Sequence, residues 1–380
     1  MREVIVVGAG PVGMLLAGEL ARHGVDVELL ERRPAAGAGT RAIGIHSPVL
    51  AALEASGTTE HLLGHAARVA RGEARCRGDV VGVVRFDRLS RRFPFVATLP
   101  QAATEAVLST GAPDPVRGAT VTAMHQGSDH VRVRAAVAGH ISERDARVVV
   151  AATGSGGRDL VYRAGALSRH EYPDRYLMTD ATAAMDADTS VAAVHLDPAG
   201  VLESFPLPDG LRRFVAWDAA PHEADTPATR AARLREAMAV RGEAQAGEGV
   251  AAATAFGVRR VVAPRLRHGR VLSVGDTAHE VSPIGGQGMN LGLLDAVTLA
   301  PLLAEWMRTG SPPPRLDAWE RRRVRSARLS AAIAAANTAL GRPASPRAHR
   351  LRMGALRALL ASPASAVFAH AYAMGFDADA

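Results

Sequence analysis

The stretch VIVVGAGPVGMLLAGELARHGVDVELLE, residues 4–31, decides how the chain begins to fold. It opens on an apolar run that is typical of a buried strand. Pro11 and Val12 stand where a helix begins, and Gly24 stands where that helix ends. A second strand is expected over residues 27–30. This order of strand, glycine turn, helix and strand predicts a βαβ unit that binds a nucleotide.

The glycines of this turn have separate roles. Gly8 lies where the chain must turn sharply, Gly10 where the backbone must approach a pyrophosphate, and Gly13 where helix and strand must touch. The phosphates would lie against the helix N-terminus, whose free N–H groups and dipole favour negative charge. Glu31 ends the second strand, where a carboxylate can accept hydrogen bonds from an adenosine ribose. These residues predict a dinucleotide, but they do not separate NAD from FAD.

A second glycine-rich segment follows another buried-strand pattern, at residues 270–274. That strand ends in Gly275 and Asp276, and an acid beside a glycine is suited to hold a polyol hydroxyl. The segment PIGGQGMN, residues 283–290, then removes side chains from the backbone just before a helix, so that a flat ring can lie against it. The helix N-terminus would stabilise the anion of a reduced flavin at the ring edge. This segment therefore favours FAD.

Composition limits the classes of function. The net charge of +7 comes from arginine, because the 380 residues include no lysine, and this excludes a lysine Schiff base. The arginines are scattered apart from the run at residues 321–323, which we interpret as a solvated helix face, and aromatic residues make up only 4% of the chain. Both features argue against a nucleic-acid partner. The single cysteine, Cys76, excludes an internal disulfide and is interpreted as a thiol without a catalytic role. We expect no metal site, because no spacing of His, Asp or Glu suggests one.

Membrane association is not expected. Long apolar stretches are missing from the sequence, and Met1 leads directly into a strand pattern, which leaves no room for a signal peptide. We therefore expect a cytoplasmic protein. The amphipathic stretch at residues 347–368 is interpreted as packing on the protein rather than on an anionic membrane. The sequence leaves the oligomeric state open.

The rest of the chain predicts a second domain. Residues 116–137 are expected to form two or three antiparallel strands, and residues 168–262 contain strand-like runs broken by proline and glycine. Beyond residues 311–314, SPPP, the pattern is helical. We therefore expect an α/β fold with a Rossmann-like FAD-binding domain, an inserted mixed or antiparallel sheet and C-terminal helices. The expected FAD-binding domain is 1–75, 98–163 and 265–310, the substrate domain is 76–97 and 168–264, and the helical region is 311–380.

The string GDTAHEVSPIGGQGMNLGLLDA, residues 275–296, together with GAGPVG and Glu31, resembles the single-component FAD-dependent aromatic hydroxylases. These are monooxygenases related to p-hydroxybenzoate hydroxylase and to the ubiquinone-biosynthesis hydroxylases. The resemblance covers residues 1–103 and 270–300. It implies that NADPH or NADH reduces FAD, that O₂ then forms a C4a-hydroperoxyflavin, and that this species hydroxylates an aromatic, quinone-like or polyketide-like small molecule.

The resemblance also implies roles for individual residues. Glu31 and Arg32 would hold the adenosine end, and Arg41 would lie near the pyrophosphate. Gln101 would make a buried contact with FAD, and Asp276 would bind the ribityl chain. The residues implied to contact the cofactor at the second glycine-rich segment are Gly275, Pro283, Gly285, Gly286, Gly288, Met289 and Asn290.

The middle motif departs from the family pattern. The family has Asp-Gly after a strand, where it contributes to binding both FAD and the nicotinamide. This chain has Thr153 and Gly154 instead, and both are still expected at the cofactor. The neutral hydroxyl leaves the nicotinamide donor open. It also keeps two alternatives open, a reductase or dehydrogenase of the geranylgeranyl reductase type and an FAD-binding protein that has lost turnover.

No catalytic base can be located from the sequence. Pro283 and His46 are candidates for catalysis only because they are expected near the flavin. His46 and His279 are otherwise interpreted as packed or hydrogen-bonded histidines. Arg212 and Arg213 could steer an anionic substrate, although arginines on a strand face are typically solvated.

Overall fold

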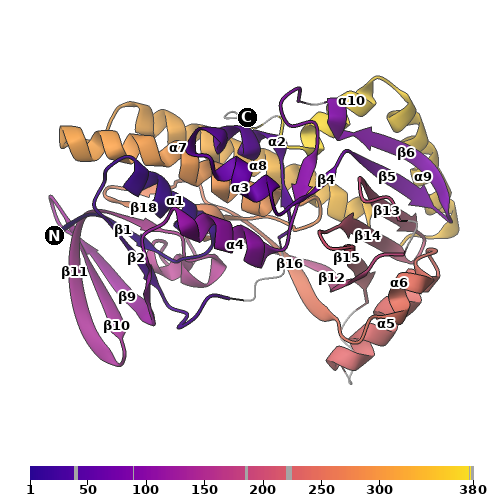
Figure 1. Ribbon diagram of the computed structural model, residues 1–380, viewed down its shortest axis with the longest axis horizontal. Coiled ribbons are helices and arrows are strands. Elements are labelled where there is room, and N and C mark those ends of the chain that lie inside the picture. The colour runs from indigo at the N-terminus through magenta and orange to yellow at the C-terminus, as the bar shows by residue number, and fades with distance from the viewer. Residues whose placement is uncertain (38–41, 89, 185–186, 220–224, 376, 378–380) are drawn as a thin grey trace.

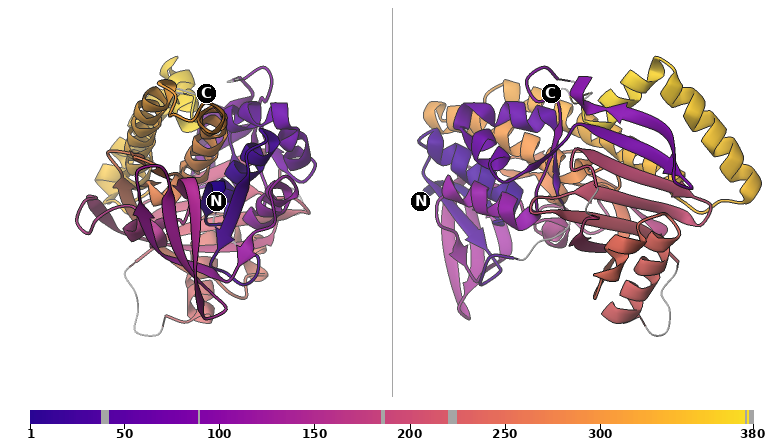
Figure 2. Two further views of the ribbon diagram at one scale, coloured as in Figure 1. Left: turned by 90° about the vertical axis from the view of Figure 1, so that its left-hand side faces the viewer. Right: turned by 45° about the vertical axis from the view of Figure 1, so that its right-hand side comes forward.

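The computed structural model describes residues 1–37, 42–88, 90–184, 187–219, 225–375 and 377. Two large sheets lie at opposite ends of the long axis, and helices run between and around them (Figures 1 and 2). The expected α/β fold class is confirmed. Within the described ranges, no helix is both long enough and apolar enough to cross a membrane.

The first sheet has a parallel centre. Strand β1 pairs in parallel with β2 on one side and with β11 on the other. The N-terminal half of β11 leaves this centre and forms an antiparallel ribbon with β10, which pairs in turn with β9. The strands are β17 (Arg267–His268), β18 (Val271–Ser273), β11 (His140–Ala151), β1 (Arg2–Val7), β2 (Val27–Glu31), β8 (Val116–Arg117), β9 (Ala119–Gln126) and β10 (Val131–Val137).

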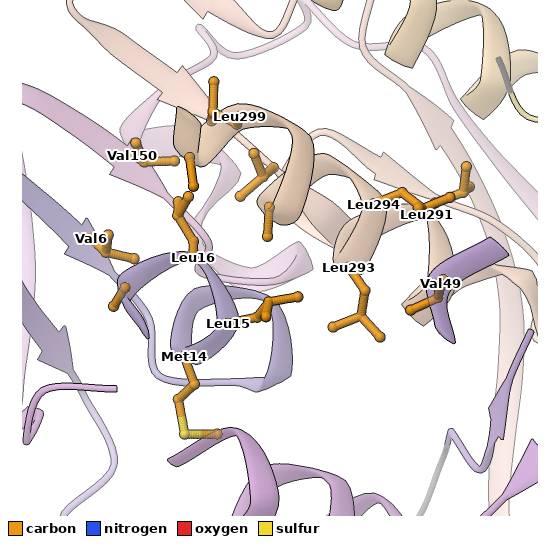
Figure 3. Close-up of a cluster of buried hydrophobic side chains, with 14 of the residues drawn as sticks. Val6, Met14, Leu15, Leu16, Val49, Val150, Leu291, Leu293, Leu294 and Leu299 are labelled. Atoms are coloured by element: carbon orange, nitrogen blue, oxygen red, sulfur yellow. The ribbon is translucent and has the colours of Figure 1, made fainter. Parts of the chain in front are cut away.

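Both faces of β1 are buried, which explains its unbroken apolar run. Val4 and Val6 face helices α1 (Pro11–Arg22) and α7 (Gln287–Thr309), whereas Ile5 and Val7 face the β9–β10 ribbon. Side chains of α1 and α7 meet directly over the sheet (Figure 3). The labelled contacts are Met14, Leu15 and Leu16 from α1, Leu291, Leu293, Leu294 and Leu299 from α7, Val49 from α2 (Ser47–Ala52), and Val6 and Val150 from the sheet. This packing joins the two glycine-rich segments, which are far apart in sequence.

The second sheet is mostly antiparallel and combines distant parts of the chain. Strand β5 pairs in parallel with β13, so that the hairpin of β5 and β6 extends a sheet built mainly from the middle of the sequence. The strand order is β19 (His279–Glu280), β16 (Thr254–Val262), β12 (Arg169–Thr182), β15 (Leu211–Asp218), β14 (Gly200–Pro206), β13 (Val191–Asp197), β5 (Arg71–Cys76) and β6 (Asp79–Arg85).

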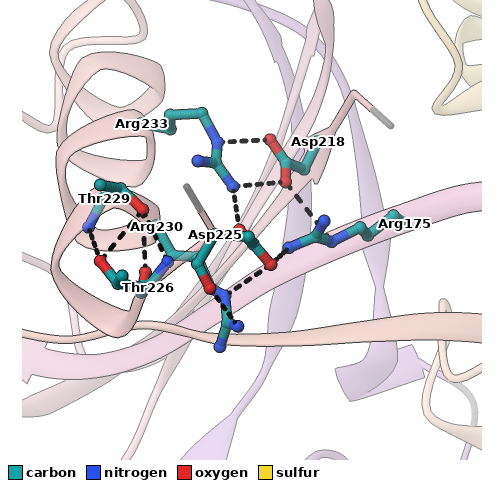
Figure 4. Close-up of polar contacts among 7 residues, drawn as sticks. All are labelled: Arg175, Asp218, Asp225, Thr226, Thr229, Arg230 and Arg233. Atoms are coloured by element: carbon teal, nitrogen blue, oxygen red, sulfur yellow. Dashed lines mark hydrogen bonds and ion pairs between the residues drawn. The ribbon is translucent and has the colours of Figure 1, made fainter. Parts of the chain in front are cut away.

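Two helices that the sequence analysis missed cover one face of this sheet. They are α5 (Pro227–Ala239), which begins with a capping box at Thr226, and α6 (Ala244–Glu248). A charged cluster fixes α5 to the strands (Figure 4). Arg233 of α5 binds both oxygens of Asp218 on β15 at 3.0 Å, and Asp225 accepts from Arg230 and Arg175. The sequence around these two helices is strand-like, so the sequence analysis did not predict them.

The remaining elements lie between and around the two large sheets. A small sheet contains β3 (Gly44–Ile45), β7 (Val96–Thr98) and β4 (Ala67–Val69). The other α-helices are α3 (Thr58–Leu63), α4 (Gln101–Thr110), α8 (Arg315–Leu340), α9 (Pro346–Ala361) and α10 (Ala364–Tyr372). The 3₁₀ helices are η1 (Glu54–Ser56), η2 (Phe86–Arg88), η3 (Ser155–Leu160) and η4 (Gly275–Thr277). The expectations of an N-terminal βαβ unit, antiparallel strands over residues 116–137 and a helical C-terminal part are confirmed.

Candidate cofactor and substrate site

A cavity of about 570 Å³ runs from the β1–α1 turn to the second sheet. One end is lined by glycines and by Glu31, and the other end is lined by apolar side chains of the second sheet and of the C-terminal helices. The predicted residues that line it are Gly8, Gly10, Pro11, Val12, Glu31, His46, Gln101, Thr153, Gly154, Gly275, Asp276, Pro283, Gly285, Gly286, Gly288 and Met289. The fold therefore gathers three separate motifs around one space.

Each glycine of the β1–α1 turn meets a different constraint. Gly8 has a φ of +107°, and a Cβ there would lie 2.3 Å from the backbone oxygen of Ala152. A Cβ at Gly13 would lie 1.8 Å from the backbone oxygen of Gly8, so Gly13 allows helix and strand to touch. A Cβ at Gly10 would meet no described atom within 4 Å, because Gly10 borders the cavity. The turn thus leaves its backbone open at Gly10, where no side chain caps α1.

The carboxylate of Glu31 is held in place beside this turn. Its Oε2 accepts from the backbone N–H of Ala9 at 2.7 Å, and its Oε1 accepts from the backbone N–H and the Nε of Arg33 at 2.8 and 3.0 Å. Burial raises the pKa of Glu31, but the hydrogen bonds from Arg33 and Ala9 outweigh burial and hold the pKa below its usual value. Glu31 is therefore an ionised acceptor at the edge of the cavity.

The second glycine segment closes against the same turn. Gly275 has a φ of +59°, and a Cβ there would lie 3.2 Å from Val12 of α1. Asp276 follows directly and lines the cavity with an exposed side chain. Across from it, the hydroxyl of Thr153 lies 3.2 Å from that of Thr277. The hydroxyl of Thr153, which stands where the family has an aspartate, therefore contacts the second glycine-rich segment.

A buried ionic network anchors the second motif. The Nε2 of His279 lies 2.6 Å from Oδ2 of Asp295, and Oδ1 of Asp295 accepts from Nε of Arg323 at 2.7 Å. Arg323 also donates to Oδ1 of Asp377 at 2.6 Å. His279 is thus a packed, paired histidine. The expectation that the arginine run at residues 321–323 is a solvated face is wrong for Arg323, which is fully buried because two carboxylates compensate its charge.

The N-terminus of α7 is tied to the loop that carries His46. Asn290 accepts from the backbone N–H of His46 at 2.9 Å and donates to the backbone oxygens of Gly44 and Gly286 at 2.9 and 2.8 Å. Gly286, with a φ of +67°, and Gly285, with a φ of +99°, expose backbone to the cavity. Asn290 therefore positions this segment from behind rather than lining the cavity.

His46 is buried and uncharged at neutral pH. Its side chain lies against the cavity near Gly286, and its Nδ1 has no hydrogen-bond partner within the described part of the chain. Burial lowers the pKa of His46 to about 4, against a smaller opposing effect of a hydrogen bond involving the Gly285 backbone. A neutral imidazole here can exchange hydrogen bonds without adding charge to the cavity.

Three predicted cofactor residues that the structure describes do not line the cavity. Gly13 packs behind the turn, and Asn290 lies behind the α7 segment. Arg32 is exposed, while the adjacent Arg33 lines the cavity and pairs with Glu31. Arg41 lies outside the described residues. The position of Arg33 at the cavity was not predicted, because the sequence does not show at which residue the alternating strand geometry of β2 ends.

The apolar end contains groups that sequence reasoning did not find. Arg212 and Arg213 on β15 are both buried, so the expectation of solvated strand-face arginines is wrong. Arg212 donates to the hydroxyl of Ser204 at 2.8 Å and to backbone oxygens, whereas Arg213 lines the cavity and binds Asp180 through Nε at 2.6 Å. Both faces of this sheet are covered; hydrogen bonds satisfy the buried Arg212, and Asp180 compensates the charge of Arg213. Other lining residues that the sequence analysis missed are Glu203, Phe256 and Tyr372. Cys76 lies away from the cavity lining, 3.4 Å from Nε2 of His349.

Comparison with known proteins identifies this arrangement. The chain matches the FAD binding domain family over residues 1–333. It is 31% identical over 344 residues to a rifampicin monooxygenase of Streptomyces venezuelae, which covers 85% of this chain and 68% of the relative. The chain belongs to this family of FAD-dependent monooxygenases. The resemblance to the flavoprotein aromatic hydroxylases is therefore confirmed, as is the assignment to FAD-dependent oxidoreductases.

Two further comparisons concern the sequence and the fold. A 12-dehydrotetracycline 5-monooxygenase/anhydrotetracycline 6-monooxygenase of Streptomyces rimosus is 29% identical, over 84% of this chain and 66% of the relative. The chain thus spans about two thirds of the length of these relatives. The crystal structure of p-nitrophenol 4-monooxygenase from Pseudomonas putida superimposes with a TM-score of 0.88 at 22% identity, over 99% of this chain and 97% of that one. At that identity the likeness concerns the fold.

Proposed function

We propose that this chain hydroxylates an aromatic, quinone-like or polyketide-like small molecule, with NADPH or NADH as the electron donor and O₂ as the oxygen source. The observation that carries the proposal is the continuity of the cavity. It joins a glycine-lined nucleotide end to an apolar chamber beneath the second sheet. A cofactor in the first part can therefore reach a substrate in the second through one continuous space.

The residues present fit FAD. Gly10 leaves open space in front of the N-terminus of α1, which suits a pyrophosphate, and the ionised Glu31 suits a ribose. Asp276 would hold the ribityl chain, and the bare backbone of Gly285 and Gly286 would receive the ring. Bound FAD supplies electron transfer from the nicotinamide and the activation of O₂. The protein supplies orientation and a fixed electrostatic environment at the ring edge.

The apolar chamber supplies dryness. Its walls include Met178, Val201 and Val215 from the second sheet and Leu356 and Leu360 from α9. Exclusion of water protects reactive intermediates and strengthens each polar contact inside. Such walls suit a planar aromatic substrate. The tetracycline and rifampicin monooxygenases named above support a ring system of this kind.

We also propose a division of labour along the chain. Residues 1–75, 98–163 and 265–310 would hold the nucleotide, residues 76–97 and 168–264 would hold the substrate, and residues 311–380 would close the chamber. The pairing of β5 with β13 supports assigning β5 to the substrate part as well. The covering position of Leu340, Leu356 and Leu360 on the cavity supports the closing role of the C-terminal helices.

Anaerobic mixing of the flavin-loaded protein with NADPH or NADH tests the donor, because flavin reduction bleaches the yellow colour. The reduced protein is then mixed with isotopically labelled O₂ and with phenols, naphthols or hydroxyanthraquinones. The masses of the products are measured by mass spectrometry. We expect the oxygen isotope in the hydroxylated product of at least one of these rings. A protein that neither donor reduces would refute the hydroxylase proposal. Reduction without labelled product from any ring would favour the reductase alternative.

A further inference from the structure

Glu203 of β14 is a buried acid that the cofactor end of the cavity does not use. It is 5% exposed and lines the apolar chamber. Within the described part of the chain, its carboxyl forms no hydrogen bond and no ion pair. The carboxyl oxygens are not among the fully enclosed polar atoms, so they face the cavity. An acid that faces a substrate chamber and has no partner among the described protein groups is available to bind a ligand.

The neighbours of Glu203 on the sheet are apolar. Register pairs it with Val194 on β13 and with Val215 on β15. Val201 and Phe205 flank it two residues away on the same strand, and therefore on the same face. All four neighbours line the cavity. Glu203 is thus the acidic centre of an apolar patch.

The charged groups around the chamber are already paired. The arginines among the described lining residues each bind a carboxylate, in the pairs Arg33 with Glu31, Arg213 with Asp180 and Arg259 with Glu280. The carboxylate of Glu73 on β5 is bound by Arg71 and Arg75. The other titratable groups that face this region are Tyr176 on β12, Tyr372 on α10 and the neutral His46.

Isolation in this patch sets the protonation state of Glu203. Burial raises the pKa of Glu203 to about 8, and no nearby cation lowers it. The carboxyl is therefore mainly neutral at pH 7. A neutral carboxylic acid both donates and accepts a hydrogen bond, whereas a carboxylate only accepts.

We propose that Glu203 is the specificity-determining residue of the substrate chamber, where its neutral carboxyl binds the hydroxyl or carbonyl oxygen of an uncharged aromatic ring. The inference rests on the proposed function for the position of the ring beside the cofactor. It adds that a ring bearing a carboxylate is rejected. Such an anion would lose its water in an apolar chamber whose cations are engaged, and it would lie next to a second acid.

Equilibrium binding to the flavin-loaded protein tests this assignment without turnover. The probes are 1-naphthol and 1-naphthoate, which share a ring and differ in charge, and binding is followed by the perturbed flavin absorbance at pH 7. We expect 1-naphthoate to bind about a hundredfold more weakly than 1-naphthol, since an anion must be desolvated. Glu203→Leu should weaken 1-naphthol binding about tenfold, as for one lost hydrogen bond.

Two further variants separate hydrogen bonding from shape and folding. Glu203→Gln keeps a neutral donor and acceptor, so it should retain 1-naphthol binding and should remove the pH dependence that ionisation of Glu203 gives this binding in the wild type around pH 8. Glu143→Gln, on an exposed position of β11, should leave binding unchanged. Flavin content confirms that each variant is folded.

Several results would overturn the assignment. These are equal affinity for the two probes, no binding of 1-naphthol by the wild type, unchanged binding in Glu203→Leu, or loss of binding in Glu203→Gln equal to that in Glu203→Leu. Failure of the proposed function gives a different pattern. In that case the probes would discriminate as expected, but no oxygenated product would form with either nicotinamide.

Discussion

Replacing Gly10 with valine should strongly weaken FAD binding and leave the fold intact. A Cβ at Gly10 meets no described atom within 4 Å, and the residue has an ordinary φ of −82°. Valine caps a helix less well than glycine does, but it also restricts the unfolded chain, so the net change in the free energy of unfolding should stay within about 1 kcal/mol. The new side chain instead fills the space in front of the α1 N-terminus.

The loss of FAD affinity can be worked out from the same geometry. If the pyrophosphate loses two hydrogen bonds to backbone N–H groups, each worth about 1.5 kcal/mol with a charged acceptor, the loss is about 3 kcal/mol. That corresponds to binding weakened roughly 150-fold. The assay is quenching of flavin fluorescence on titrating the apoprotein, with thermal unfolding of the apoprotein by circular dichroism as the measure of folding.

Two other glycines serve as controls for this experiment. Gly111→Val, at a position with open space and away from the cavity, should change neither FAD affinity nor unfolding. Gly13→Ala should destabilise the apoprotein by more than about 3 kcal/mol, because its Cβ would lie 1.8 Å from a backbone oxygen. If Gly10→Val folds normally and binds FAD within about threefold of the wild type, the phosphates do not lie against this turn.

Two further predictions concern buried charges. Asp295→Asn should lower the free energy of unfolding in urea by about 3 kcal/mol, because Arg323 is fully buried and loses one of its carboxylates. Asp26→Asn removes an exposed ion pair and should lower the free energy of unfolding by less than about 0.5 kcal/mol. Equal losses in Asp295→Asn and Asp26→Asn would contradict the reasoning. The pKa of His46 is about 4 when folded, below the 6.5 of a free imidazole side chain, so the unfolded state binds more protons between these values and stability falls as pH falls. Wild type should lose about 2 kcal/mol more than His46→Gln between pH 7 and pH 5, and parallel urea curves would disprove the assignment.

The parts of the site that depend on local chain geometry could be predicted from the sequence. The turn at Gly8, Gly10 and Gly13 is one such part, because the positive φ of Gly8 and the close approach of Gly13 to the Gly8 backbone are both set within a few residues. The helix at the second motif is another, since Pro283 to Asn290 expose backbone next to a long apolar run. Arg33 could not be separated from Arg32 in this way, because the choice depends on how β2 ends.

The substrate chamber depends on contacts that the sequence does not display. Glu203 lies in a strand buried on both faces, so alternation of polar and apolar residues gives no signal there. The sequence does contain a signal for the burial of Arg323. This residue lies on the same helical stripe as Leu316, Trp319 and Ala327, which are buried, and such spacing predicts a buried position. A charge in that stripe indicates a buried partner elsewhere.

The parallel pairing of β5 with β13 has a consequence for how the protein is made. Val191 pairs with Arg71, so the β5–β6 hairpin leaves the ribosome long before its partner strand exists. Until then it presents an unpaired strand edge, which is a route to aggregation. Such a non-local contact also slows folding, because the entropy cost of closing the long loop comes before strand pairing stabilises the chain. Production in a host should therefore respond to slower translation and to chaperone supply more than to changes at the flavin.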